Sequence, residues 1–440
     1  MHEKKINRKG STIPMDRKTK ALCAFLDSSH SVYHAAANVM TTLDREGYTQ
    51  LSEGANWNLL PGGKYYVVRG GSAVIAFRVP QEAPQGFLIA ASHTDRPSFK
   101  LKLTPELAGT YTRVSTELYG GAILYSWLDR PLSIAGRVLV ETEKGAEVRL
   151  IDLDRDLLLI PSVAIHMNRQ LNDGYKWNLT QDLTPLFGGK EDAGKLTEML
   201  EKAAGGKILS HDLYLYVRQK ACVWGAGNQF ISSQALDDLQ CLYGCMQGFL
   251  KASTGRSIPV FCALDSEEVG SSSTQGAGST FLEDTLFRIA EGLGRGYPQL
   301  LSQSFLLSAD NAHAVHPNHP ELADPANAPV MGEGIVLKFN TNLRYCTDAL
   351  GAAVFRTVCK KAGVPVQSYY NRADIPGGST LGHISISHVS VPTADIGLPQ
   401  LAMHSSFETA HIRDSAYLQD AMAAFFGSTL SFSGSGFVAE

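Results

Sequence analysis

The hydrophobic and polar positions near the start of the chain have helical spacing first and a strand-like pattern afterwards. Apolar residues recur at helical spacing over 16–48 and predict two helices, the second of which ends at Gly47. Three strand-like runs follow, over 64–70, 72–79 and 86–92. The third, GFLIAAS, is almost wholly apolar, which is typical of a strand buried on both faces of a sheet.

Strand and helix patterns alternate again after residue 227. Strands are predicted over 258–264, 303–310, 334–340, 364–370 and 389–397. Helices are predicted over 235–251, 280–292, 348–362, 379–388 and 412–425. Such alternation predicts a three-layer α/β/α domain with a mainly parallel central sheet.

The region between these two parts has a different texture. Short strand patterns such as GRVLVE, VRLIDL and LYLYVRQ alternate with turns, and a polar stretch over 188–207 predicts a helix or a loop. We therefore predict that residues 16–99 and 228–440 form one α/β domain, and that 100–227 form an inserted β-rich domain. Residues 1–15 are polar and basic and predict a mobile tail.

Charge and composition exclude several classes of partner. The chain has 440 residues, of which 39 are basic and 43 acidic, so it has no excess of positive charge for nucleic acid or an anionic membrane. Residues 1–15 lack the apolar stretch of a secretory signal, and no later apolar segment is long enough for a membrane helix, which favours a cytoplasmic protein. The seven scattered cysteines fit reduced, buried thiols; Cys241 and Cys245, one helical turn apart, could form a metal pair but fit core packing better.

Polar side chains gather where the predicted strands end. His93 and Asp95 follow the strand 86–92, Glu267 and Glu268 follow 258–264, and Asp310 follows SFLLSA. Asp237 lies near the start of the helix predicted over 235–251, and His404 follows the run VSVPTADIGLPQLAM. In an open α/β sheet these ends share one edge, and imidazoles with carboxylates suit zinc, manganese or cobalt.

The adjacent glutamates fit a centre with two metals. Such a centre needs one bridging carboxylate and about two further ligands for each ion. One glutamate of the pair could hold a metal while the other acts as a general base. If His93 and Asp95 share a strand, their side chains point to the same side, and Asp95 could orient the imidazole. A serine hydrolase is disfavoured because no G-x-S-x-G elbow follows a strand.

Several segments together resemble one peptidase family. They are ASHTDRP, ELYGGAILYSWLDRPLSIAGRV, PSVAIHMNR, ALDDL, DSEEVGSSSTQGA, SADNAHAVHPNH, KFNTNLRY and PQLAMHS. In this order, from about Phe25 to Phe426, they resemble the aspartyl aminopeptidase family of dinuclear zinc metallopeptidases. The resemblance implies removal of N-terminal Asp or Glu from peptides with an acidic N-terminus, and a dodecamer built from dimers through the inserted domain.

The resemblance also implies the roles of the metal-site residues. Two divalent ions are expected, Zn²⁺ first with Mn²⁺ or Co²⁺ as alternatives, together with Glu267 as the base. The implied ligands are Asp237, Glu268 and His404 for one ion, and His93, Asp237 and Asp310 for the other, with Asp237 as the bridge. Asp238 stands where the family usually has Asn, and we expect it to face away as a residue that starts the helix.

Three further residues match family positions near the substrate. Lys338 would supply a cation for the acidic side chain, and His313 would support the ligands or the oxyanion. His166 would reach from the inserted domain into a neighbouring subunit's site. Two alternatives stay open: a dinuclear aminopeptidase or deacylase of another specificity, and a silent scaffold on the same fold, which predicts lost ligands that this chain retains.

Overall fold

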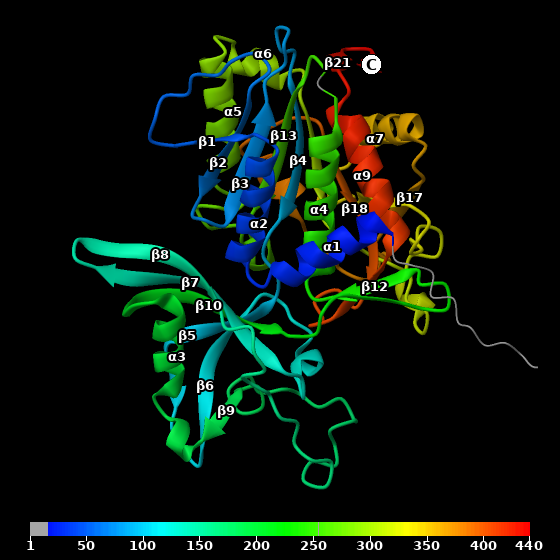
Figure 1. The fold of residues 1–440 in the computed structure, drawn as a ribbon. Helices are drawn as coiled ribbons and strands as arrows, with labels where there is room; N and C mark the ends of the chain where they lie inside the picture. Colours follow the sequence, from blue (N-terminus) through cyan, green and yellow to red (C-terminus); the bar gives the residue numbers. More distant parts are fainter. Residues whose placement is uncertain (1–15, 254) are drawn as a thin grey trace, which may run out of the picture.

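The computed structural model describes residues 16–253 and 255–440, and the tail predicted over 1–15 lies outside them. One large sheet with helices on both faces stands above a smaller, separate sheet (Figure 1). The large sheet and its helices carry the N-terminal and C-terminal parts of the chain, whereas the smaller sheet and α3 (Lys195–Ala204) are built from its middle.

The large sheet has nine strands in the order β1-β2-β3-β13-β4-β14-β18-β16-β17. Five of its eight neighbouring pairs are parallel, including all pairs among the central strands β13, β4, β14 and β18. The bounds are β1 (Thr49–Leu51), β2 (Lys64–Arg69), β3 (Ala73–Arg78), β4 (Phe87–His93), β13 (Ile258–Leu264), β14 (Phe305–Ala309), β16 (Ile335–Phe339), β17 (Val366–Tyr370) and β18 (Thr393–Gly397).

Two apolar cores separate the sheet from its helices. One face packs against α1 (Arg17–Ser28), α2 (Val32–Arg45), α4 (Leu236–Lys251), α7 (Ala349–Ala362) and α9 (Ile412–Phe426). The other packs against α5 (Phe281–Gly292), α6 (Tyr297–Leu301) and α8 (Leu381–Ser385). Strand β4 is buried along its whole length between the two cores, as its apolar sequence predicts. The three-layer α/β/α prediction is confirmed.

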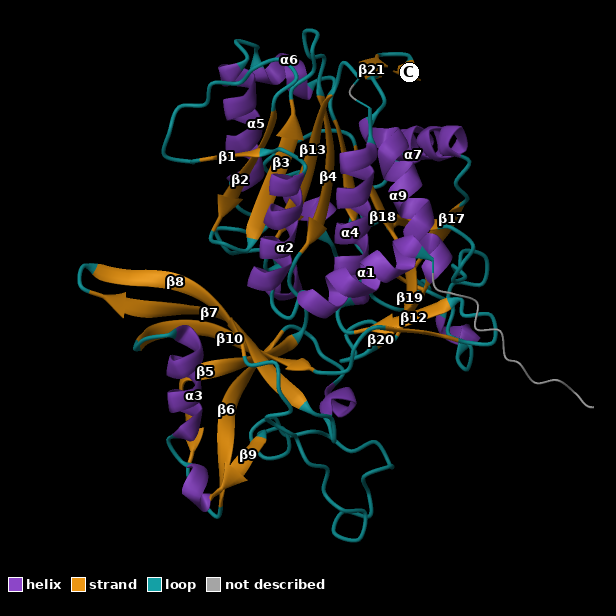
Figure 2. Cartoon of the chain, in the orientation of Figure 1, coloured by secondary structure: helices purple, strands orange, loops and turns teal. Residues whose placement is uncertain are grey.

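The smaller sheet has six strands in the order β8-β7-β10-β5-β6-β9 (Figure 2). They are β5 (Ser98–Leu107), β6 (Tyr111–Tyr119), β7 (Leu132–Thr142), β8 (Gly145–Asp152), β9 (Leu186–Gly189) and β10 (Ile208–Val217). The polar stretch forms α3 (Lys195–Ala204), which buries Leu196 and Leu200 in this sheet's own core. A separate core supports an inserted domain, although the bounds 100–227 stay a prediction.

A third sheet was not predicted from the sequence. Its strands are β11 (Cys222–Trp224), β12 (Phe230–Ser233), β20 (Glu408–His411), β19 (Pro399–Leu401) and β15 (Ala312–His313), and β21 (Leu430–Ser433) and β22 (Gly436–Ala439) form a separate hairpin. These strands have two to four residues, too few to show an alternating pattern. No helix of the described residues is long and apolar enough to span a membrane.

Candidate metal centre

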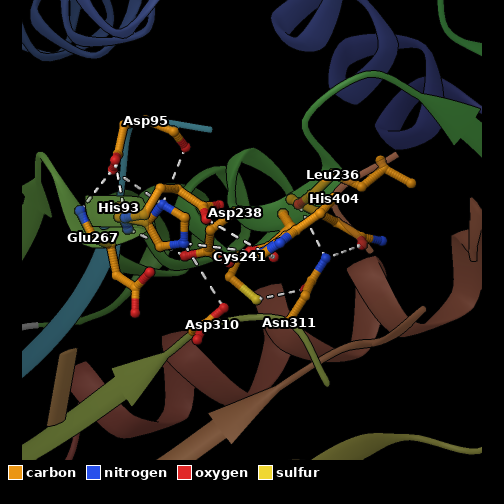
Figure 3. Close-up of polar contacts among 12 residues, drawn as sticks. His93, Asp95, Leu236, Asp238, Cys241, Glu267, Asp310, Asn311 and His404 are labelled. Carbon is orange, nitrogen blue, oxygen red and sulfur yellow. Dashed lines mark hydrogen bonds and ion pairs between the residues drawn. The ribbon is translucent and has the colours of Figure 1, made fainter. Parts of the chain in front are cut away.

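The centre lies where several segments converge beyond the carboxyl edge of the large sheet (Figure 3). Strand β4 ends at His93, which lies opposite Leu264 at the end of the parallel strand β13. Glu267 and Glu268 follow β13, and Asp310 follows β14. The edges of parallel strands coincide, so sequence-distant side chains meet here as the sequence predicts.

Asp237 lies between the two histidines. Its Oδ1 is 3.3 Å from Nε2 of His93, and its Oδ2 is 3.6 Å from Nε2 of His404. His93 Nε2 is also 3.8 Å from Asp310 Oδ1, and His404 Nε2 is 3.3 Å from Glu268 Oε2. One carboxylate therefore faces both imidazoles, each of which has a further carboxylate beside it.

Among the described residues, three sets of possible ligand atoms have members within 4.8 Å of one another. The sets are His93 with Asp237, Asp238 and Asp310; His93 with Glu267 and Glu268; and Asp237 with Glu268 and His404. The first and third share Asp237. Imidazole nitrogens and carboxylate oxygens at this spacing are the donor set of a zinc site.

Buried oxygens without hydrogen-bond partners fit a metal at this place. Within the described residues, Asp237 Oδ1, Asp238 Oδ1 and Glu268 Oε1 are buried and accept no hydrogen bond. An unpaired buried carboxylate oxygen is costly, because desolvation is not repaid. A cation among these oxygens would compensate them, so the residues present fit the metal that the donor set suggests.

The carboxylates are crowded enough to disturb one another's ionisation. Burial raises the pKa of Glu268 and of Asp237, and neighbouring negative charges add to both shifts. Burial also acts to raise the pKa of Asp310, but the charges of Lys338 and His93 hold it well below its usual range. The crowded carboxylates therefore favour nearby positive charge, and Lys338 supplies one beside Asp310.

Glu267 belongs to the set formed by His93, Glu267 and Glu268. Within the described part of the chain, it does not make a close contact with an imidazole of the kind that Glu268 makes with His404. Burial raises the pKa of Glu267 to about 8, and the negative charges of Asp310 and Asp237 add to the shift while His93 opposes it. Its backbone N–H donates to Asp95 Oδ1 at 3.1 Å, and that of Glu268 donates to Asp95 Oδ2 at 3.1 Å.

Asp95 therefore contacts both glutamates as well as His93. The strand argument for this contact is wrong, because β4 ends at His93 and Asp95 lies beyond it. The contact exists nevertheless: His93 Nδ1 is 3.1 Å from the backbone oxygen of Asp95 and 3.3 Å from its Oδ1. The hydroxyl of Tyr119, at the end of β6, donates to Asp95 Oδ2 at 2.7 Å.

The expectation that Asp238 faces away is also wrong. Its side chain is fully buried, and Oδ2 accepts a hydrogen bond from the backbone N–H of His93 at 3.2 Å. The reason is local: Asp237 and Asp238 do not have helical dihedral angles, so the regular part of α4 begins after them. Asp238 thus points into the cluster instead of out from a helix end.

Of the three residues predicted to bind substrate, Lys338 contacts the metal cluster, His313 lines a hollow, and His166 lies away from both. Lys338, on β16, is 2% exposed, and its Nζ lies 3.3 Å from Asp310 Oδ2 and 3.1 Å from the oxygen of Asn311. His313, on β15, lines a hollow of about 320 Å³. His166 is exposed in the long segment between β8 and β9, and the chain's own fold does not bring it to this cluster.

The two cysteines of α4 pack in the core, as predicted. Cys245 accepts a hydrogen bond from Ser92 at 3.6 Å, and the Cys241 thiol donates to Asn311 Oδ1 at 3.0 Å. Two other residues of the site were missed. Tyr119 comes from a different sheet, and Glu408, four residues after His404, accepts hydrogen bonds from the backbone of Asp237 and of His404.

Comparison with known proteins places the chain in a family. The family model for the aminopeptidase I zinc metalloproteases, M18, matches residues 25–426. A probable M18 family aminopeptidase 2 from Clostridium acetobutylicum is 40% identical over an alignment of 423 residues, which covers 92% of this chain and 98% of that protein.

Solved structures agree with this assignment. Ape4, in a complex with Nbr1, is 34% identical with a TM-score of 0.89, over 93% of this chain and 85% of that one. The dodecamer of mApe1 from S. cerevisiae is 26% identical with a TM-score of 0.82, over 92% of this chain and 95% of that one. The fold and the site therefore define a zinc metalloprotease. The chain belongs to the M18 family of zinc aminopeptidases.

Proposed function

We propose that the protein releases N-terminal Asp and Glu residues from peptides, using two divalent ions and Glu267 as the general base. The observation that carries the dinuclear part is the position of Asp237, whose two oxygens face His93 and His404 separately. Asp237 would bridge the ions, one completed by His93 and Asp310 and the other by Glu268 and His404. The donor set favours Zn²⁺, with Mn²⁺ and Co²⁺ as alternatives.

Ions held by these residues would lower the pKa of a water molecule and polarise the first peptide carbonyl. Glu267 lies beside His93 and Glu268 without being required as a ligand. It would take the proton from the attacking water and pass it to the leaving amine. Asp95 would act as a positioning residue, because it holds the backbone of Glu267 and Glu268 and contacts the imidazole of His93.

The preference for an acidic residue rests on Lys338. An ammonium has three N–H donors, and two of them point to Asp310 and to the oxygen of Asn311. The third would be available to the side-chain carboxylate of the substrate. His313, which comes three residues after Asp310 and lines a hollow, would support the oxyanion.

We also infer an assembly of twelve subunits built from dimers; the number twelve is supported by the related mApe1, which forms a dodecamer. His166, which is exposed in the segment between β8 and β9, would then reach into the site of a neighbouring subunit. A cytoplasmic location is part of the proposal, since all seven cysteines are free thiols, five of them buried.

The test is hydrolysis of aspartyl-, glutamyl-, leucyl- and lysyl-p-nitroanilide by the zinc-loaded protein and by Lys338→Met, with bound metal measured in parallel. Lys360→Met, at an exposed position near the end of α7, is the control. The acidic substrates should be cleaved best, and only Lys338→Met should lose that preference.

Other outcomes favour the alternatives. Faster cleavage of the leucyl or lysyl substrate would contradict the acidic specificity but leave the metal chemistry in place. Hydrolysis of N-acyl amino acids alone would favour a deacylase. Zinc-loaded protein without any hydrolytic activity would favour a scaffold.

A further inference from the structure

Glu408 is a buried carboxylate that contacts the backbone of two residues of the metal centre, Asp237 and His404. It is 2% exposed and stands at the start of β20. Its Oε1 accepts a hydrogen bond from the backbone N–H of His404 at 2.7 Å, and its Oε2 accepts one from the backbone N–H of Asp237 at 2.9 Å. One side chain therefore holds the main chain of two residues that face each other across the centre.

The third sheet explains why a single residue reaches both. Glu408 pairs with Ser233 of β12, and Asp237 follows four residues after Ser233. On its other side β20 pairs with β19, and His404 lies in the turn between these two strands. Both metal-site residues thus lie in short connections that leave the same small sheet.

Each of these connections contains a non-glycine residue in the left-handed region. Ala235, two residues before Asp237, has φ 55°, and His404 itself has φ 68°. Such conformations are disfavoured for residues with a Cβ and persist only where surrounding contacts hold them. The two hydrogen bonds to Glu408 are contacts of this kind.

The site requires a carboxylate in particular. The Glu408 oxygens are the acceptors in all of these hydrogen bonds, including a weak one from Gln400 Nε2 at 3.5 Å, so Glu408 needs two acceptor atoms and no donor. A glutamine at this position would have one oxygen and one NH₂ group, so its NH₂ would face one of the two backbone N–H groups. That N–H would then be buried without an acceptor, which costs free energy.

We infer that Glu408 is a positioning residue whose carboxylate fixes the backbone of Asp237 and His404 so that their side chains bind the two ions together. The inference rests on the proposed dinuclear function. It assigns Glu408 no contact with substrate or metal: its effect passes through the two ligands whose main chain it holds.

The test measures zinc affinity in the full-length, metal-depleted protein, by competition with a chromophoric chelator, for wild type, Glu408→Gln and Glu408→Asp. Asp414→Asn is the matched control. Asp414 is also a fully buried carboxylate that accepts two backbone N–H groups, those of Gly332 at 2.6 Å and Gly334 at 3.0 Å, but it lies outside the metal cluster.

Zinc affinity of Glu408→Gln should fall about ten- to hundredfold for at least one ion. Glu408→Asp keeps both acceptor oxygens and should retain more affinity than Glu408→Gln, whereas Asp414→Asn should bind zinc like the wild type. At saturating zinc, kcat of Glu408→Gln should fall while KM changes little.

Three results would overturn the inference: zinc affinity of Glu408→Gln within twofold of the wild type, an equal loss in Asp414→Asn, or no advantage of Glu408→Asp. If Glu408→Gln does not fold, the zinc affinity of Glu408→Asp is compared with that of Asp414→Asn. A lower affinity in Glu408→Asp alone would support the inference, and equal affinities would overturn it. A wild type that binds one zinc ion, or that binds two without hydrolysing peptides, would instead contradict the proposed function.

Discussion

The hydroxyl of Tyr119 donates a 2.7 Å hydrogen bond to Oδ2 of Asp95 and so joins the smaller sheet to the metal centre. The two following residues extend this contact. A side chain at Gly120 would place its Cβ 3.1 Å from that of Glu268, and the oxygen of Gly121 accepts a hydrogen bond from His404 Nδ1 at 2.9 Å. The end of β6 is therefore one wall of the site.

Tyr119→Phe should lower kcat/KM about fivefold, corresponding to the roughly 1 kcal/mol of one hydrogen bond. The reason is that Asp95 loses a donor and holds His93 and the glutamate backbone less firmly. Steady-state kinetics on the best p-nitroanilide substrate measure the change. Tyr125→Phe, at a position 66% exposed, is the control and should behave like the wild type. Unchanged kinetics in Tyr119→Phe would show that the contact does not support the site.

Asp238→Asn should stabilise the metal-free protein. Burial raises the pKa of Asp238 well above its ordinary value, so its charge is unfavourable beside Asp237 and Asp310. An Asn oxygen can still accept the backbone N–H of His93. Thermal unfolding after chelation should show a gain on the order of 1–3 kcal/mol, with zinc stoichiometry unchanged. Loss of one zinc ion in this variant would mean that Asp238 is itself a ligand.

Asp414 should make stability depend on pH. Burial raises its pKa to about 7 from an ordinary value of 3.8, with Glu333 adding to the shift and Arg413 and the Gly332 and Gly334 N–H groups opposing it. Between these values the folded protein keeps a proton that the unfolded chain has lost, so this contribution to stability decreases as pH rises through the window. Calorimetry from about pH 5 to about pH 8 should therefore show a smaller fall in Tm for Asp414→Asn than for the wild type. An equal fall in both proteins would contradict the assignment.

Long apolar runs made the main sheet predictable. The strands that became β4, β13 and β14 have five to seven consecutive buried residues, and such runs are recognisable without any partner. Because parallel strands end at one edge, the positions of His93, Glu268 and Asp310 followed from the sequence order alone.

The third sheet, and the site residues that depend on contacts between distant parts of the chain, could not be predicted from apolar runs. Strand β20 has four residues, and nothing in ETAH distinguishes Glu408 from an exposed glutamate. Tyr119 meets Asp95 across 24 residues and from another sheet, which no local pattern encodes. Asp238 was misplaced because its backbone departs from the helix that its sequence pattern predicts.

The most direct test of the account is Glu267→Gln, assayed for zinc content and for turnover of aspartyl-p-nitroanilide in one preparation. Glutamine has nearly the same shape but cannot accept the proton of the attacking water. We expect two zinc ions per subunit, as in the wild type, with turnover reduced by about 10²–10⁴-fold. Wild-type turnover in a zinc-loaded Glu267→Gln protein would contradict the assignment of Glu267 as the base, and loss of one zinc ion would make Glu267 a ligand instead.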